Sequence, residues 1–149
     1  YYGDELGMIG EKDQLDDGQR QNFPGGFPHD KINALTGKGL TSAMKQHFAF
    51  TQQLLKWRKL PEINPIIAQG ELVQFNPRSG VYVYARIKDG RTITVLLNGT
   101  SKTQIVQLDT FREVLPPEKS VPEILSGKLF DLSKKTLRIK SHDVFLFAL

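Results

Sequence analysis

The chain has 149 residues, 39% of them hydrophobic and 24% charged, which is the composition of about one globular domain with a core of its own. It contains no cysteine, which excludes disulfides, thiolate metal sites and cysteine nucleophiles, and it has no apolar run long enough for a transmembrane helix. Its 20 basic and 16 acidic residues are spread without a basic block, so the net charge of +4 does not predict binding to nucleic acid.

The first forty residues have no regular hydrophobic period. The opening YYGDE predicts the end of a strand that runs into a turn at Gly3. It has the features of neither a signal peptide nor a natural start, so we expect a piece of a longer protein. Residues 6–40 predict a long loop with one short helix near residues 30–36. Within it, DDGQRQNFPGGFPHD (residues 16–30) contains two phenylalanines, which disorder rarely does, so we expect an ordered functional loop.

Residues 41–60 predict one long helix. The segment has no internal glycine or proline, Thr41 or Ser42 can cap its amino end, and Pro61 follows its carboxyl end. Apolar and aromatic side chains at helical spacing make a broad stripe of Ala43, Met44, His47, Phe48, Phe50, Leu54, Leu55 and Trp57. We therefore expect this helix to pack against a large apolar surface.

From about residue 66 the hydrophobic period becomes that of β-strands. The sequence GVYVYARIKDGRTITVLLNGT predicts a hairpin that turns at Asp89-Gly90. One face of its first strand is expected to carry Val81, Val83, Ala85 and Ile87, and the other Tyr82, Tyr84 and Arg86. Further strands are expected at 71–75, 104–108, 111–115, 128–132, 136–140 and 143–148. Short strands with turn residues between them predict a mainly β fold, an antiparallel sandwich of about eight strands.

Motifs that depend on fixed spacing are missing from the chain. It has no G-x-S-x-G elbow, no H-E-x-x-H and no phosphate-binding G-x-x-x-x-G-K, and Gly25-Gly26 is too short to cradle a phosphate. His29, His47 and His142 are scattered, without a carboxylate cluster beside them. We therefore predict no metal site, no cofactor and no catalytic nucleophile within the chain.

The carboxylates near the start are the strongest chemical signal. They cluster in the first seventeen residues, close to Arg20, and comprise Asp4, Glu5, Asp13, Asp16 and Asp17. Such a cluster is commonly a solvated surface, but hydrolysis of a glycoside needs a pair of carboxylates. Sugar sites combine acids and arginine for the hydroxyls with aromatic rings for the sugar faces. Asp16, Asp17, Arg20, Phe23 and Phe27 match that inventory loosely.

The order of these parts resembles the C-terminal end of the α-amylase family of glycoside hydrolases, family 13. The resemblance rests on YYGDELGMIG, on the loop with DGQR, on the helix that ends in LLKWRKLPEI, and on the β domain that follows. The passage DGQRQNFPGGF is most similar to neopullulanases and cyclomaltodextrinases, in particular those of gut Bacteroidetes. The motifs are specific in residues 1–27, moderate in 41–62 and weak beyond, where only the strand pattern supports the resemblance.

The resemblance implies two domains. Residues 1–62 would be the last strand, substrate-side loop and last helix of a (β/α)8 barrel, and residues 63–149 a C-terminal Greek-key β-sandwich. The loop would lie at the substrate face of the barrel. There Arg20, with Asp16 or Asp17, would bind a glucose hydroxyl, and Asp16 has the better spacing. Phe27 would line the same side, and Phe23 would anchor the loop.

The resemblance also implies what the chain lacks. In the family the three catalytic carboxylates lie on barrel strands upstream of the position of Tyr1, so we expect this chain alone to be inactive. The parent would be an exported, periplasmic enzyme that cleaves α-1,4 and in some members α-1,6 bonds of α-glucans with retention. Its partners would be the glucan substrate, the preceding barrel and, as in related enzymes, a second copy.

Two alternatives stay open. The sandwich can instead be a carbohydrate-binding module that stacks Tyr82 and Tyr84 on sugar rings, although alternating aromatic residues in strands usually pack across the sheet. An unrelated interaction domain would make the YYGDELGM and DGQR motifs a coincidence.

Overall fold

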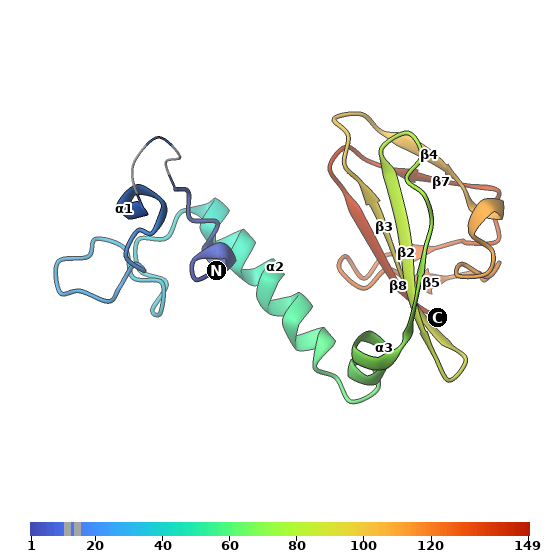
Figure 1. The fold of residues 1–149 in the computed structure, drawn as a ribbon, viewed down its shortest axis with the longest axis horizontal. Coiled ribbons are helices and arrows are strands. Elements are labelled where there is room, and N and C mark those ends of the chain that lie inside the picture. The colour runs from blue at the N-terminus through green and yellow to red at the C-terminus, as the bar shows by residue number, and fades with distance from the viewer. Residues whose placement is uncertain (11–12, 14–15) are drawn as a thin grey trace. The chain divides into compact units, whose positions relative to one another are not determined.

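The computed structural model describes residues 1–149 except residues 11, 12, 14 and 15 and, within its first α-helix, the side chains of Asp17 and Gln19. The chain divides into two compact units, Tyr1–Lys56 and Trp57–Leu149 (Figure 1). Among the described residues, no helix is both long and apolar enough to cross a membrane. The assignment of residues 1–62 to a barrel and of 63–149 to a separate domain stays a prediction.

The first unit contains helical turns, loops and most of one long helix. Its elements are the 3-10 helix η1 (Asp4–Leu6), α1 (Asp16–Gln19) and α2 (Ser42–Arg58), of which the last two residues belong to the second unit. The helix predicted over residues 41–60 is thus confirmed. Thr41 caps it, because its hydroxyl accepts a hydrogen bond of 3.2 Å from the Met44 amide. No side chain of α2 is buried, and Phe50 and Leu55 are 42% and 52% exposed.

Two local predictions for the first unit were wrong. The turn predicted at Gly3 forms, but the strand expected before it does not, and the turn leads directly into η1. A strand needs a neighbour for its backbone groups, and the described part of this unit offers only an isolated bridge between Asn33 and Lys38. That bridge also replaces the short helix expected near residues 30–36, because it closes a turn held by the Asn33 amide and the Lys38 carbonyl, 2.8 Å apart.

The second unit is an antiparallel β domain preceded by a short helix (Figure 1). Its elements are α3 (Asn64–Gln69), β1 (Glu71–Gln74), β2 (Val81–Lys88), β3 (Arg91–Asn98), β4 (Gln104–Gln107), η2 (Leu108–Phe111), β5 (Val121–Pro122), β6 (Leu129–Phe130), β7 (Thr136–Ile139) and β8 (Val144–Ala148). Four strands form a sheet in the order β1-β2-β3-β8, and two further pairs are β4-β7 and β5-β6. All pairs are antiparallel, so the predicted mainly β class is confirmed.

The predicted hairpin forms the centre of the main sheet. β2 and β3 pair over their full length, from Val81↔Asn98 to Lys88↔Arg91, with Asp89-Gly90 as the two-residue turn. Both turn residues have positive φ, 52° and 75°, as a hairpin turn of this length requires. The expected alternation holds: Val83 and Ala85 are 1% and 0% exposed and belong to the hydrophobic core.

The strand predicted at 111–115 was wrong. Residues 108–111 form η2, and a turn follows in which the Leu115 amide bonds the Phe111 carbonyl at 2.8 Å. Phe111, Val114 and Leu115 are all buried. Their spacing of i, i+3 and i+4 is that of a helical turn, whereas a half-buried strand would alternate.

A second, smaller apolar cluster went unpredicted. It lies where α3 contacts β2 and β3, and it buries Ile63, Ile66 and Ile93. Two arginines of the hairpin fix this contact: Arg86 donates to the Gly70 carbonyl at 3.0 Å and Arg91 to the Glu62 carbonyl at 2.7 Å. A six-residue helix is too short to leave a clear period in the sequence.

Candidate functional site

The YYGDELGM segment folds back on itself around Gly3. Gly3 has φ of 90°, and a Cβ there would lie 2.4 Å from the sulfur of Met8, so no other residue fits without movement. The Gly3 amide donates to the Glu5 carboxylate at 3.0 Å, and the Leu6 and Met8 amides both donate to the Gly3 carbonyl at 3.0 Å. Leu6 is 1% exposed. The motif therefore makes a compact turn whose shape depends on its glycine.

The structure brings together two of the predicted sugar-binding residues. Asp16 and Arg20 stand one helical turn apart at α1, and the Arg20 guanidinium lies 3.3 Å from the Asp16 carboxylate. Both side chains are exposed, so the ion pair itself adds little stability and both groups are accessible to a ligand. The side chain of Asp17 lies outside the described part of the structure. The choice between Asp16 and Asp17 as the partner of Arg20 in sugar binding therefore stays a prediction.

The YYGDE turn and the DGQR helix are neighbours. The pKa of the Tyr2 hydroxyl is raised, chiefly by a hydrogen bond with Tyr1, while the nearby positive charge of Arg20 acts in the opposite direction. A hollow of about 60 Å³ is lined by residues of the YYGDELGMIG segment together with Gln21. That volume holds a few water molecules and is far below that of a ligand pocket.

Phe23 and Phe27 have different environments. Phe23 is half-buried, whereas Phe27 is 57% exposed. The loop between them is fastened by Asp30, which the sequence interpretation overlooked. One carboxylate oxygen of Asp30 accepts hydrogen bonds from the Gly25 amide at 2.7 Å and the Phe27 amide at 3.0 Å. An aspartate four residues after a Gly-Gly pair is the signal that could have revealed it.

Tyr82 and Tyr84 lie side by side on the face of β2 that points away from the main core. Their ring centroids are 5.4 Å apart with a tilt of 31°, and both are half-buried. The Tyr82 hydroxyl donates to the side chain of Gln74. In register they face Leu97 and Val95 of β3. The pair thus has cross-strand neighbours, as ordinary sheet packing requires, and also an accessible edge.

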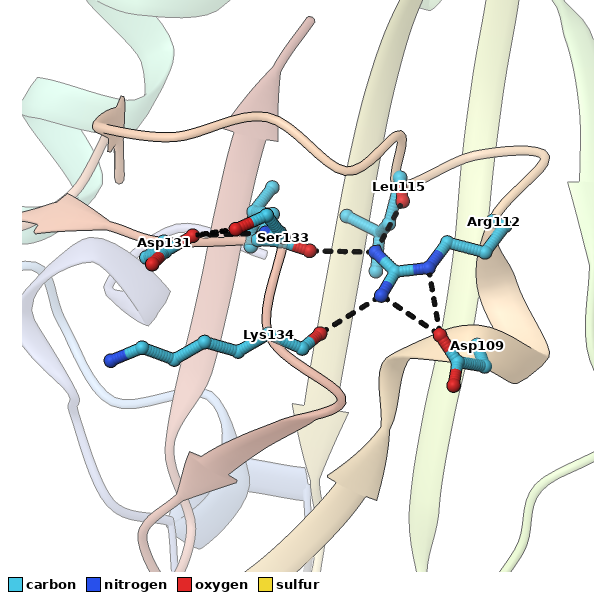
Figure 2. Close-up of polar contacts among 7 residues, drawn as sticks. Asp109, Arg112, Leu115, Asp131, Ser133 and Lys134 are labelled. Atoms are coloured by element: carbon cyan, nitrogen blue, oxygen red, sulfur yellow. Dashed lines mark hydrogen bonds and ion pairs between the residues drawn. The ribbon is translucent and has the colours of Figure 1, made fainter.

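One polar network of the β domain surrounds Arg112 (Figure 2). Its guanidinium donates twice to Asp109, at 2.9 and 3.0 Å, and to the carbonyls of Leu132 at 2.6 Å and Lys134 at 2.8 Å. The arginine thereby ties η2 to the loop before β7. All these partners belong to the protein, so we assign Arg112 a structural role.

Two buried polar residues also join loops. Asn98, 2% exposed, donates to the carbonyls of Lys102 and Lys140 at 2.8 and 2.7 Å and accepts from Thr100. Glu123, also 2% exposed, accepts from Ser126 and from the Leu125 and Leu146 amides. Burial alone would raise the pKa of Glu123, but these hydrogen bonds outweigh it and the pKa is lowered. Every strong contact is internal, so neither residue marks a ligand site.

A metal centre has no candidate in the part of the chain that the structure describes: no three side chains of His, Asp or Glu come close enough to hold one ion. Within the first unit, the described contacts join the YYGDE turn to the segment with Arg20 and Gln21, and Asp16, Arg20 and Phe27 are all exposed.

Comparison with known families identifies the β domain. The family model described as the cyclo-malto-dextrinase C-terminal domain matches residues 72–148, just over half of the chain. The match begins at β1 and ends at the last residue of β8.

Solved structures extend the likeness to the whole chain. An Anoxybacillus α-amylase shares 23% identity with a TM-score of 0.68, covering 100% of this chain and 28% of that chain. The α-amylase from Geobacillus thermoleovorans, complexed with acarbose, shares 19% with a TM-score of 0.60, covering 99% and 28%. The trehalulose synthase MutB from Pseudomonas mesoacidophila shares 19% with a TM-score of 0.54, covering 81% and 22%. At these identities the likeness shows the fold, and the chain spans about a quarter of each structure.

Proposed function

Because the chain belongs to the family of the cyclo-malto-dextrinase C-terminal domain, we propose that it is the C-terminal part of an α-glucan hydrolase of the α-amylase family. The match over residues 72–148 carries this proposal, and the like fold of two α-amylases over 99–100% of the chain supports it. The narrower assignment, to a neopullulanase-like enzyme of the Bacteroidetes type, rests on the sequence DGQRQNFPGGF alone.

In this proposal the two units have separate roles. The β domain is structural, since its conspicuous polar residues Arg112, Asn98 and Glu123 are occupied with internal hydrogen bonds. The first unit contributes substrate contacts: Asp16, Asp17 and Arg20 hold a hydroxyl group of a glucosyl unit, and Phe27 lines the same subsite. An exposed pair such as Asp16 and Arg20 can exchange part of its ion pair for hydrogen bonds to a sugar hydroxyl.

The chemistry would reside outside residues 1–149. Retaining cleavage of α-1,4 or α-1,6 bonds needs a nucleophilic carboxylate and a carboxylic acid that flank the scissile bond. Three of the described carboxylates are already engaged, because Asp16 is ion-paired and Asp30 and Glu123 are bound to backbone amides. The proposed partners are a preceding catalytic barrel, its glucan and a second copy of the enzyme, in the periplasm.

A titration with maltoheptaose followed by residue-resolved NMR tests this proposal. We expect shifts that centre on Asp16–Phe27, and we expect Arg20→Ala to weaken binding by about tenfold. Arg138→Ala removes an exposed arginine from β7 and serves as the charge-matched control with unchanged binding. The chain should release no reducing sugar from starch or pullulan. Hydrolysis by the purified chain would overturn the proposal, and so would chemical shift changes that are the same in the unchanged chain and in Arg20→Ala.

The second candidate, a glucan-binding sandwich, is favoured by one observation. The rings of Tyr82 and Tyr84 are 5.4 Å apart on a common face, with the polar Gln74 side chain at their edge. The same titration separates the two candidates, because a glucan bound there would shift residues of β1–β3 and leave Asp16–Phe27 unchanged.

A further inference from the structure

The loop of residues 23–40 combines an exposed aromatic ring with a closely fastened backbone. Phe27 is 57% exposed, and its neighbours Gly26 and Pro28 are exposed as well. A large apolar side chain on a mobile loop would lose little by turning toward other apolar groups, as Phe23 does by becoming half-buried. The contrast within one loop indicates that the backbone fixes where Phe27 can stand.

Asp30 provides the first constraint on that backbone. Its carboxylate accepts from the Gly25 and Phe27 amides, and its own amide donates to the Phe27 carbonyl at 3.1 Å. Phe27 is therefore held through both its N–H and its C=O. These charge-assisted hydrogen bonds, first that from Phe27 and then that from Gly25, keep the pKa of Asp30 below its usual range, so the carboxylate is ionised at neutral pH.

Gly25 and the following turn provide the second constraint. Gly25 has φ of 102°, and a Cβ there would lie 2.8 Å from the side chain of Asn33. Asn33 is itself fixed, since its backbone forms the bridge to Lys38 and its side chain accepts from the Thr36 amide at 2.9 Å. The Ala34 amide donates to the Pro24 carbonyl at 3.0 Å. The two halves of the loop thus support each other.

We infer that Phe27 is a stacking platform for one glucosyl ring of an α-glucan, and that Asp30 is the positioning residue that holds this platform in place. The inference deepens the proposed function and rests on it. The flat side of a pyranose carries C–H groups and suits an aromatic face, whereas its hydroxyls need groups such as Arg20 and Asp16. A preorganised ring binds without the entropic cost of ordering its loop, which explains why so many hydrogen bonds support one exposed side chain.

Exposure of one phenylalanine suits a sugar ring better than a protein partner. A protein interface needs a cluster of apolar groups around such an anchor. Besides Phe27, the described part of this loop exposes only Leu35 as a large apolar side chain, at 81%. Leu35 therefore serves as the matched control: it is exposed and apolar, it stands on the same loop, and it has no aromatic face.

Binding of maltoheptaose to the full chain, measured by NMR, tests the platform. Phe27→Ala should weaken binding by about tenfold, Phe27→Tyr should restore it, and Leu35→Ala should leave it unchanged. Asp30→Ala should weaken binding several-fold and should increase amide hydrogen exchange at Gly25 and Phe27. Asp30→Asn keeps an acceptor oxygen and should retain most of the affinity. If the negative charge were what matters, Asp30→Asn would instead bind as weakly as Asp30→Ala.

The outcomes distinguish this inference from the proposed function. If maltoheptaose shifts Asp16 and Arg20 but Phe27→Ala binds as well as the unchanged chain, the platform is wrong and the proposed function stands. If neither region responds at millimolar maltoheptaose, both fall. If Asp30→Ala loses exchange protection without losing affinity, Asp30 orders the loop but binding does not depend on that order, and its role as a positioning residue is wrong.

Discussion

Residues 1–56 and residues 57–149 stay folded by different means. The described part of the first unit buries a single large apolar side chain, Leu6, and takes its order from turns, capping groups and glycines with positive φ. The second unit has a continuous core that includes Val83, Leu96 and Phe147. Hydrogen bonds exposed to water contribute little net stability, whereas buried apolar area contributes most of it. The first unit thus depends mainly on local hydrogen bonds and turns, whereas the second depends mainly on its buried core.

The largest effect should follow from emptying the core of the β domain. Phe147 is fully buried and contacts the rings of Phe130 and Phe145 at centroid distances of 5.8 and 6.1 Å. Phe147→Ala should lower the free energy of unfolding by about 4 kcal/mol in urea denaturation. Leu129→Ala, at a residue 67% exposed, should change it by less than about 0.5 kcal/mol. Similar values for the two would contradict our account of the core.

The Arg112 network should rank second. Arg112→Ala leaves the carbonyls of Leu132 and Lys134 without their donor and should cost about 2 kcal/mol in the same measurement. Arg112→Lys keeps the charge but not the planar fork, so it should recover only part of this. If the lysine variant is as stable as the unchanged chain, the charge matters and the geometry does not.

Glu123 predicts a dependence of stability on pH. Its pKa is lowered below the ordinary value of 4.5, so the folded state is favoured above that pH and loses this advantage as the pH falls through the lowered pKa. Asp131, whose pKa Ser133 lowers, acts in the same direction. Glu123→Gln should cost about 1–2 kcal/mol at pH 7 and flatten the fall in melting temperature between pH 5 and pH 3. If the melting temperature of Glu123→Gln falls as steeply between pH 5 and pH 3 as that of the unchanged chain, Glu123 does not cause the dependence on pH.

The smallest effect should be confined to α2. Thr41→Ala removes the cap on the Met44 amide and should reduce the hydrogen-exchange protection of the first turn of α2 by about 1 kcal/mol. Because α2 buries no side chain, the urea midpoint of the β domain should stay the same. Thr41→Ser retains the hydroxyl and is the control. A shift of the β-domain midpoint would show that the two units unfold together.

The sequence predicted elements whose signal is local and missed those that depend on tertiary contacts. The turn at Asp89-Gly90 and the cap at Thr41 each depend on a sequence signal of only a few residues. By contrast, the residues from Phe111 to Leu115 have the composition of a strand. They form helical turns instead, because these turns bury Phe111, Val114 and Leu115 on one side. α3 was missed because two isoleucines in a six-residue helix leave no period.

The candidate site was predicted in part for the same reason. Asp16 and Arg20 were expected in a loop, and their ion pair depends on the unpredicted helix α1 (Asp16–Gln19), although their separation of four residues follows from the sequence. That Asp30 binds the amides of Gly25 and Phe27 does not, because an aspartate in a Gly-Pro-rich loop has many backbone partners within reach. The difference in exposure between Phe23 and Phe27 likewise depends on the folded loop.

The turn at Asp89-Gly90 offers a place to attach a reporter. A Cβ at Gly90 would meet nothing within 4 Å, so the tip of the longest hairpin is surrounded by open space. Asn98, at the other end of β3, is buried and bound to two loops, and an insertion there would break them apart. A short flexible peptide with one cysteine, placed between Asp89 and Gly90, would carry the sole thiol of the chain. A fluorophore on that thiol would follow the opening of β2 from β3 while every core side chain stays native.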